Sequence, residues 1–160
     1  MRKVGFWLPA NGYFDFGVIP FIIHRGQITD SYTHSEVSGR SYVSGITNFL
    51  GWMSSGNVIN CYSASNVIGN DYFSSGIFSK GRYASPTIVD SYYDNFDGAM
   101  MCGRGPTYNC NDLDKGRITS ELQNPGWIGF ANWDNEAIWI MNNGEYPRLK
   151  EKVPGSDPGF

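Results

Sequence analysis

The chain has 160 residues, of which 16% are aromatic and 17% are charged, and its formal net charge is −3. This length suffices for one domain with a hydrophobic core, and so many aromatic residues exclude a disordered chain. A weakly acidic chain without a basic block argues against nucleic acid as a partner. No apolar run reaches the roughly 20 residues that a membrane-spanning helix needs.

Residues 1–26 are predicted to form a degenerate first repeat. The segment from Tyr13 to Phe21 corresponds to the segment that begins at Tyr42, with Tyr13 aligned on Tyr42. The charged start at Met1 resembles a signal peptide, but Pro, Asn, Gly and Asp interrupt the stretch that follows. We therefore expect any export signal to lie on a longer parent chain.

Residues 27–95 repeat themselves with a period of 30. A fixed period in this range is typical of architectures in which each unit buries its apolar face against its neighbours. Such chains usually serve as scaffolds or binding surfaces. The recurring sets are Ile28, Val58 and Ile88; Asp30, Asn60 and Asp90; Ser31, Cys61 and Ser91; and Tyr32, Tyr62 and Tyr92.

Each repeat is predicted to contain two short strands joined by glycine-rich turns. In the first copy they run from Ile28 to Val37 and from Tyr42 to Phe49. Strict alternation puts successive side chains on opposite faces, with rungs stacked about 4.8 Å apart. In the second copy this alternation places a small-residue set inside, and it places Val58, Asn60 and Tyr62 outside. The inward set is Ile59, Cys61, Ser63, Ser65 and Val67.

Residues 96–149 are predicted to form a loop and an aromatic C-terminal cap. A helical turn is expected at Ile118–Gln123, because Asn124-Pro125 stops it. The cap holds Trp127, Trp133 and Trp139, and it would cover the sheet edge and the open core of the last rung. Residues 150–160, rich in Pro and Gly, are predicted to be a flexible tail.

The cysteines and histidines suggest no catalytic or metal site. Cys61 replaces a repeat serine and is predicted to be a small buried side chain. Whether Cys102 and Cys110 form a local disulfide stays open, because both lie in one glycine-rich loop. His24 and His34 match no ligand spacing.

Two groups of Asp and Asn residues are candidate sites. The run from Asp94 to Asp97 offers a fragment of a calcium loop, and calcium there stays open. Asp30, Asn60 and Asp90 recur in every copy, which favours a turn or ladder role over catalysis, since catalysis needs unlike neighbours. We expect no catalytic residue, no metal and no cofactor.

The repeats resemble the GLUG-motif family of bacterial cell-surface proteins. The resemblance lies in Gly26-Gln-Ile-Thr-Asp-Ser-Tyr32, Gly56-Asn-Val-Ile-Asn-Cys-Tyr62 and Thr87-Ile-Val-Asp-Ser-Tyr92. The Gly-Leu-x-Gly segment that names the family is replaced here by Ser44-Gly-Ile-Thr-Asn-Phe-Leu-Gly51. The resemblance implies a β-solenoid accessory module in large exported adhesins and proteases, without catalytic residues.

Together these features predict an all-β, right-handed β-helix-like solenoid of about three repeats with an aromatic cap. The predicted function is a non-enzymatic extracellular or cell-surface module for adhesion or structural projection, binding a glycan or a surface protein. The candidate ligand contacts are Trp52 and an exposed column of tyrosines, Tyr32, Tyr62 and Tyr92.

Two alternatives stay open. One is a structural subunit of an extracellular fibre that self-associates through rung edges, which concentration-dependent light scattering would reveal. The other is a fragment of a β-helix carbohydrate-active enzyme, which turnover of a pectin-like polymer would reveal.

Overall fold

Strands dominate the computed structural model, which describes residues 5–6, 10–12, 16–17, 26–39, 43–49, 56–69, 75–80, 87–95 and 115–150. Helix is limited within these ranges to α1 (Thr119–Leu122) and the 3-10 turn η2 (Ile128–Phe130). The prediction of an all-β chain is therefore confirmed. Among the described residues, no helix is long and apolar enough to cross a membrane.

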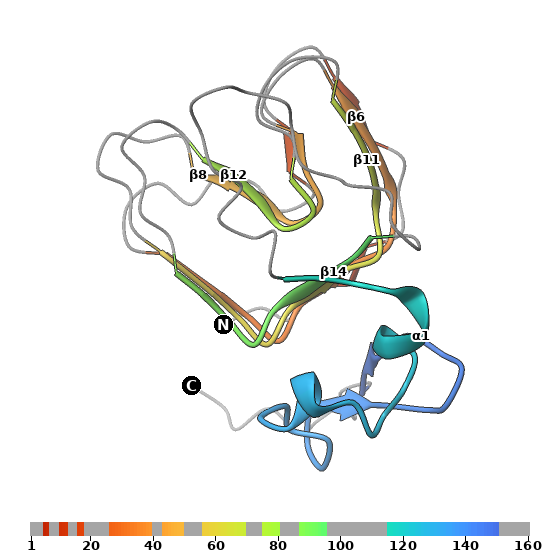
Figure 1. The fold of residues 1–160 in the computed structure, drawn as a ribbon. Helices are drawn as coiled ribbons and strands as arrows, with labels where there is room; N and C mark the ends of the chain where they lie inside the picture. The colour runs from red at the N-terminus through yellow and green to blue at the C-terminus, as the bar shows by residue number, and fades with distance from the viewer. Residues whose placement is uncertain are drawn as a thin grey trace.

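Parallel strands from successive copies pair in register over residues 5–117 of the described chain. Figure 1 shows them lying over one another around a common interior. One sheet runs β1 (Gly5–Phe6), β5 (Tyr32–Thr33), β10 (Tyr62–Ser63), β14 (Tyr92–Asp94) and β15 (Gly116–Arg117). A second runs β4 (Gln27–Thr29), β9 (Asn57–Ile59) and β13 (Thr87–Val89).

Three shorter sheets complete the stack. They are β2 (Ala10–Gly12), β6 (Glu36–Gly39) and β11 (Asn66–Gly69); β3 (Phe16–Gly17) and β7 (Val43–Ser44); and β8 (Thr47–Phe49) and β12 (Phe78–Lys80). Tyr32 pairs with Tyr62, and Tyr62 with Tyr92, so the 30-residue period of the sequence is the register in which β4, β5 and β6 pair with their equivalents in the next copy. The pairing of β8 with β12 is shifted by one residue from that period, since Thr47 pairs with Phe78.

The first-copy alignment differs from the prediction. Phe16 pairs with Val43, whereas aligning Tyr13 on Tyr42 would place Phe14 there. Tyr13 itself lies outside the described residues. The aromatic residues of the first copy therefore did not mark its register, which the backbone pairing sets.

The copies that begin at Gln27 and Asn57 each contain more strands than the predicted two. The predicted strand from Ile28 to Val37 is divided into β4, β5 and β6, and its first break falls at Asp30. Asp30, Asn60 and Asp90 have φ angles of 48°, 52° and 44°. A left-handed residue turns the chain sharply, so each copy bends around the interior instead of running straight.

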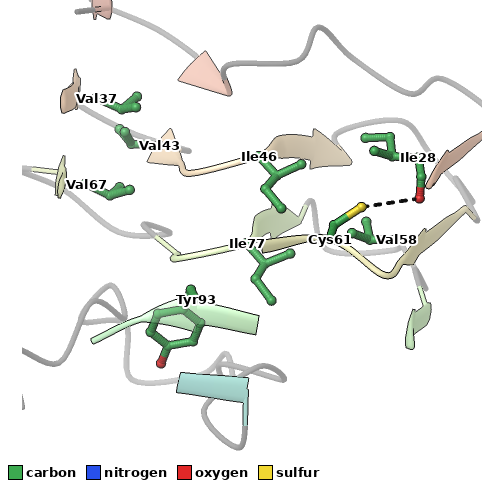
Figure 2. Close-up of a cluster of buried hydrophobic side chains, with 9 residues drawn as sticks. All are labelled: Ile28, Val37, Val43, Ile46, Val58, Cys61, Val67, Ile77 and Tyr93. Atoms are coloured by element: carbon green, nitrogen blue, oxygen red, sulfur yellow. Dashed lines mark hydrogen bonds between the residues drawn. The ribbon is translucent and has the colours of Figure 1, made fainter. Parts of the chain in front are cut away.

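The left-handed residue also resets the alternation of side chains. Val58 and Cys61 both point into the interior although three positions separate them. The prediction that Val58 points outward and Ile59 inward is wrong, because it assumed one unbroken strand. Figure 2 shows the resulting interior cluster, which holds Ile28, Val37, Val43, Ile46, Val58, Cys61, Val67, Ile77 and Tyr93.

The C-terminal segment, residues 115–150, packs mainly against the flank of the stack. The expected helical turn is present as α1, and β16 (Trp139–Ile140) and β17 (Arg148–Leu149) form an antiparallel pair. Only β15 extends a repeat sheet, where it pairs with β14. In Figure 1 the segment lies outside the ring of stacked strands, beside β14.

Candidate functional site

The predicted ligand column forms, since Tyr32, Tyr62 and Tyr92 stand at equivalent places on β5, β10 and β14. The rings of Tyr32 and Tyr62 are nearly parallel, 5° apart, with centroids separated by 5.3 Å. Side-by-side pairing of parallel strands brings such rings within stacking distance. We call these three residues the tyrosine column.

Tyr62 and Tyr92 of the tyrosine column are covered and Tyr32 is half-buried, so the prediction of an exposed column is wrong. Tyr62 is 1% exposed and Tyr92 is 7% exposed, because the C-terminal segment packs on them. Trp133 and Trp139 lie with ring centroids 6.3 Å and 6.2 Å from that of Tyr62. A ligand role for the column stays a prediction. The surface that a ligand would use is in contact with the C-terminal segment.

Arg117 fixes the start of the C-terminal segment against the column. Its guanidinium carbon lies 5.3 Å from the ring centroid of Tyr92 and 5.4 Å from that of Trp127. A cation held by two aromatic rings stabilises by electrostatic attraction to their π faces. Trp127 also meets Tyr92 edge-on, with centroids 4.6 Å apart.

Tyr146 lies where the C-terminal segment packs on the tyrosine column. We call this contact region the junction. The ring of Tyr146 is nearly parallel to that of Tyr62, 8° apart with centroids separated by 6.0 Å. The Tyr62 hydroxyl donates a hydrogen bond of 2.6 Å to the carbonyl oxygen of Pro147. Burial, and then the neighbouring phenols of Tyr32 and Tyr146, raise the pKa of Tyr62 well above its ordinary value.

Asp94 is a buried carboxylate at the same junction, with 0% exposure. The Thr119 hydroxyl donates to its Oδ1 at 3.1 Å, and the Tyr146 hydroxyl donates to its Oδ2. Hydrogen bonds of this kind offset the cost of burying a charge. Asp94 is thereby committed to the junction, which removes one of the oxygen ligands suggested for calcium. Asp97 lies outside the described residues.

His34 completes this group of polar side chains. His34, Ala64 and Asp94 occupy the same position in successive copies, and the His34 ring lies 5.4 Å from the Tyr146 ring at 68°. Burial lowers the pKa of His34, and the negative charge of Asp94 acts in the opposite direction. The sequence pattern gave no sign of this junction, because Tyr146 stands outside the repeat.

A second column of small polar groups lies inside the stack. The Ser91 hydroxyl donates to the carbonyl of Val89 at 2.9 Å and accepts from the backbone N–H of Cys61 at 3.0 Å. Ser31 donates to the carbonyl of Thr29 at 2.8 Å. Cys61 is buried, as predicted, and burial is the main cause that raises its pKa to about 12. The thiol therefore has little nucleophilic character.

The predicted structural role of the repeated Asx residues is confirmed. Their backbone amides link neighbouring copies, with Asp30 N–H donating to the Ile59 carbonyl and Asn60 N–H to the Val89 carbonyl, both at 3.1 Å. In the last copy, the Asn132 amide donates to the Asp90 carboxylate at 2.9 Å. Asn and Asp tolerate the left-handed conformation better than other non-glycine residues.

An outward-facing surface on β4, β9 and β13 was missed in the sequence. Ile28 and Val58 point inward, so the residues on either side of them point outward. The sequence signal was the recurring apolar residue at positions 28, 58 and 88, whose neighbours alternate to the other face of the sheet. We call this surface the β9 face, defined by Gln27, Thr29, Asn57, Ile59, Thr87 and Val89, of which Thr29 is buried, with 9% exposure.

The other candidate residues fall outside the described part of the chain. These are Trp52, His24, Cys102 and Cys110. Within the described residues, no group of three or more His, Cys, Asp or Glu side chains could hold a metal ion. Comparison with protein-family models, with curated proteins and with solved structures gave no match for this chain.

Proposed function

We propose that the chain is a right-handed β-solenoid of about three 30-residue coils and acts as a non-enzymatic module for adhesion or structural projection. We place it outside the cell or on the cell surface. The observation that carries the proposal is a difference between structural and outward-facing positions of the repeat. Positions that stay alike between copies face the interior, form the corners or pack against the C-terminal segment.

Positions that face outward differ between copies. Gln27, Asn57 and Thr87 are equivalent and exposed, and Glu36 is equivalent to the exposed Asn66. Sequence identity that is confined to structural positions supports a scaffold whose exterior is free to vary. An extended surface of this kind suits the binding of a glycan or of a protein on a neighbouring surface.

The resemblance to the GLUG-motif family supports the same assignment, and membership of that family is part of the proposal. Both oxygens of the buried Asp94 accept hydrogen bonds from hydroxyl groups of the C-terminal segment. A carboxylate held in this way contributes to docking the segment.

Binding of the folded chain to immobilised glycans and to intact cells tests the proposal. We expect saturable binding to one of them that heat-denatured protein lacks. Absence of binding to both would overturn the adhesion role. Growth of particle size with concentration in light scattering would instead favour a fibre subunit.

A further inference from the structure

We propose that the β9 face binds a neutral glycan chain. This inference rests on the function proposed above and adds the site and the class of ligand. The face is a parallel sheet in which Gln27, Asn57 and Thr87 form one outward column. Thr29, Ile59 and Val89 form the next column, in which Thr29 is buried and Val89 is exposed.

The side chains of the β9 face carry no charge. Gln27, Asn57 and Thr87 are exposed and offer amide and hydroxyl groups, which both donate and accept hydrogen bonds. The hydroxyl groups of a sugar need the same mixture. Beside them Val89 is 40% exposed and Ile59 is half-buried, so C–H groups of a ligand ring meet an apolar strip.

The spacing of these groups favours a chain of repeating units. Equivalent side chains on neighbouring parallel strands recur about every 4.8 Å across the sheet. A linear polymer lying across β4, β9 and β13 therefore meets an amide or a hydroxyl group at each step. A compact ligand would use only one or two of them.

Charge decides between neutral and anionic polymers. The corner residues that follow the face in each copy are Asp30, Asn60 and Asp90, and none of the nine residues of face and corner is Lys, Arg or His. Carboxylates beside the face repel uronate, sulfate and phosphate groups. A neutral polymer avoids that repulsion.

The second outward surface of the stack provides a matched control. On β6 and β11 it carries Glu36 and Asn66. Asn66 and Asn57 are both exposed first residues of strands in the same copy. Replacing either of them removes the same amide from a comparable backbone.

A panel of neutral hexose oligosaccharides and of uronate and sulfated chains would be screened with the whole chain. Any hit would be titrated calorimetrically with N57A, T87A and N66A. We expect a neutral chain to bind with an affinity that does not depend on salt. We expect N57A or T87A to raise Kd about tenfold and N66A to change it by less than about twofold.

Selective binding of charged chains, or equal effects of N57A and N66A, would overturn this inference. Binding to cells through a protein, with a blank panel, would also overturn it while leaving the adhesion function in place. Absence of binding both to cells and to the panel would overturn the glycan inference and the adhesion function together. Far-ultraviolet circular dichroism of each variant confirms that the fold is kept, and T87A replaces N57A if N57A unfolds.

Discussion

Single residues in left-handed backbone conformation set the shape of each repeat. Asp30, Asn60 and Asp90 occupy a region that costs most L-residues free energy, and each one starts a corner. The left-handed conformation also resets which side chains of the next strand point inward and which point outward. The identity of these residues is therefore a requirement of the backbone.

Asn60→Val is expected to lower the free energy of unfolding by about 1–2 kcal/mol, because a β-branched residue resists positive φ. Asn60→Gly serves as the control, since glycine adopts the same φ without steric strain. Urea titration followed by circular dichroism measures both. An N60V chain as stable as the parent would contradict the corner role.

The hydroxyl groups of Tyr146 and Tyr62 donate to different kinds of acceptor, a carboxylate and a backbone carbonyl. Tyr146→Phe leaves the buried Asp94 carboxylate with one donor fewer, and we expect a loss of about 2–3 kcal/mol in the free energy of unfolding. Tyr62→Phe leaves only the neutral Pro147 carbonyl without its donor, and about 1 kcal/mol is expected. The same urea titrations would compare the two variants. A larger loss in Y62F than in Y146F would disprove the assignment.

His34 gives the junction a dependence on pH. Burial lowers its pKa in the folded chain below the ordinary 6.5, so the unfolded chain binds the proton more readily. The stabilisation is complete above pH 6.5 and is lost as pH falls from there through the folded pKa. We expect a smaller free energy of unfolding at about pH 5.5 than at neutral pH, and we expect His34→Gln to weaken that difference. An equal difference in H34Q would show that other groups cause it.

At the scale of elements, β14 ends the interior of the stack. Its Tyr93 stands where the earlier copies have Thr33 and Ser63. A Cβ atom on Gly76 would lie 2.2 Å from the Tyr93 ring, and one on Gly116 would lie 2.7 Å from its hydroxyl. Figure 2 shows the ring between Ile77 and β15, so the Tyr93 side chain fills the interior at this level of the described chain.

Tyr93→Ser restores the residue of the preceding copy and removes this filling side chain. We expect a loss of about 3 kcal/mol or more in the free energy of unfolding, because a large buried ring leaves a cavity. Val89→Ser, on the exposed face of the neighbouring sheet, should cost much less. Thermal unfolding of both variants measures the contrast, and similar shifts in Tm would argue against this role of Tyr93.

At the scale of the whole molecule, β14 joins two hydrophobic clusters. Tyr93 belongs to the interior cluster, while Tyr92 belongs to the junction with Leu122, Phe130, Trp133 and Trp139. Neighbouring residues of one strand therefore contact both. Loss of either cluster removes support from the other.

We expect the repeats and the C-terminal segment to unfold in one transition. With Trp7 and Trp52 replaced by Phe, tryptophan fluorescence reports Trp127, Trp133 and Trp139, and circular dichroism reports the strands. Coincident urea transitions would support a single cooperative unit. Separate transitions would show that the C-terminal segment folds independently of the stack.

The sequence by itself determined the all-β character, the register in which β4, β5 and β6 pair with the next copy, and the structural role of the repeated Asx residues. A 30-residue period fixes which residues lie side by side, because identical units stack in register. It also marked Cys61 as a small buried side chain, since serine fills the equivalent places.

Only the tertiary structure decided which residues point inward at each corner and what covers the tyrosine column. The left-handed residues break the simple alternation, so Val58 lies inside although an unbroken strand would place it outside. The covering contacts join residues far apart in sequence. Tyr146 and Asp94 are separated by 52 positions, and Tyr62 and Pro147 by 85. No local period encodes such pairs, because they depend on how the nonrepeating segment packs against the stack.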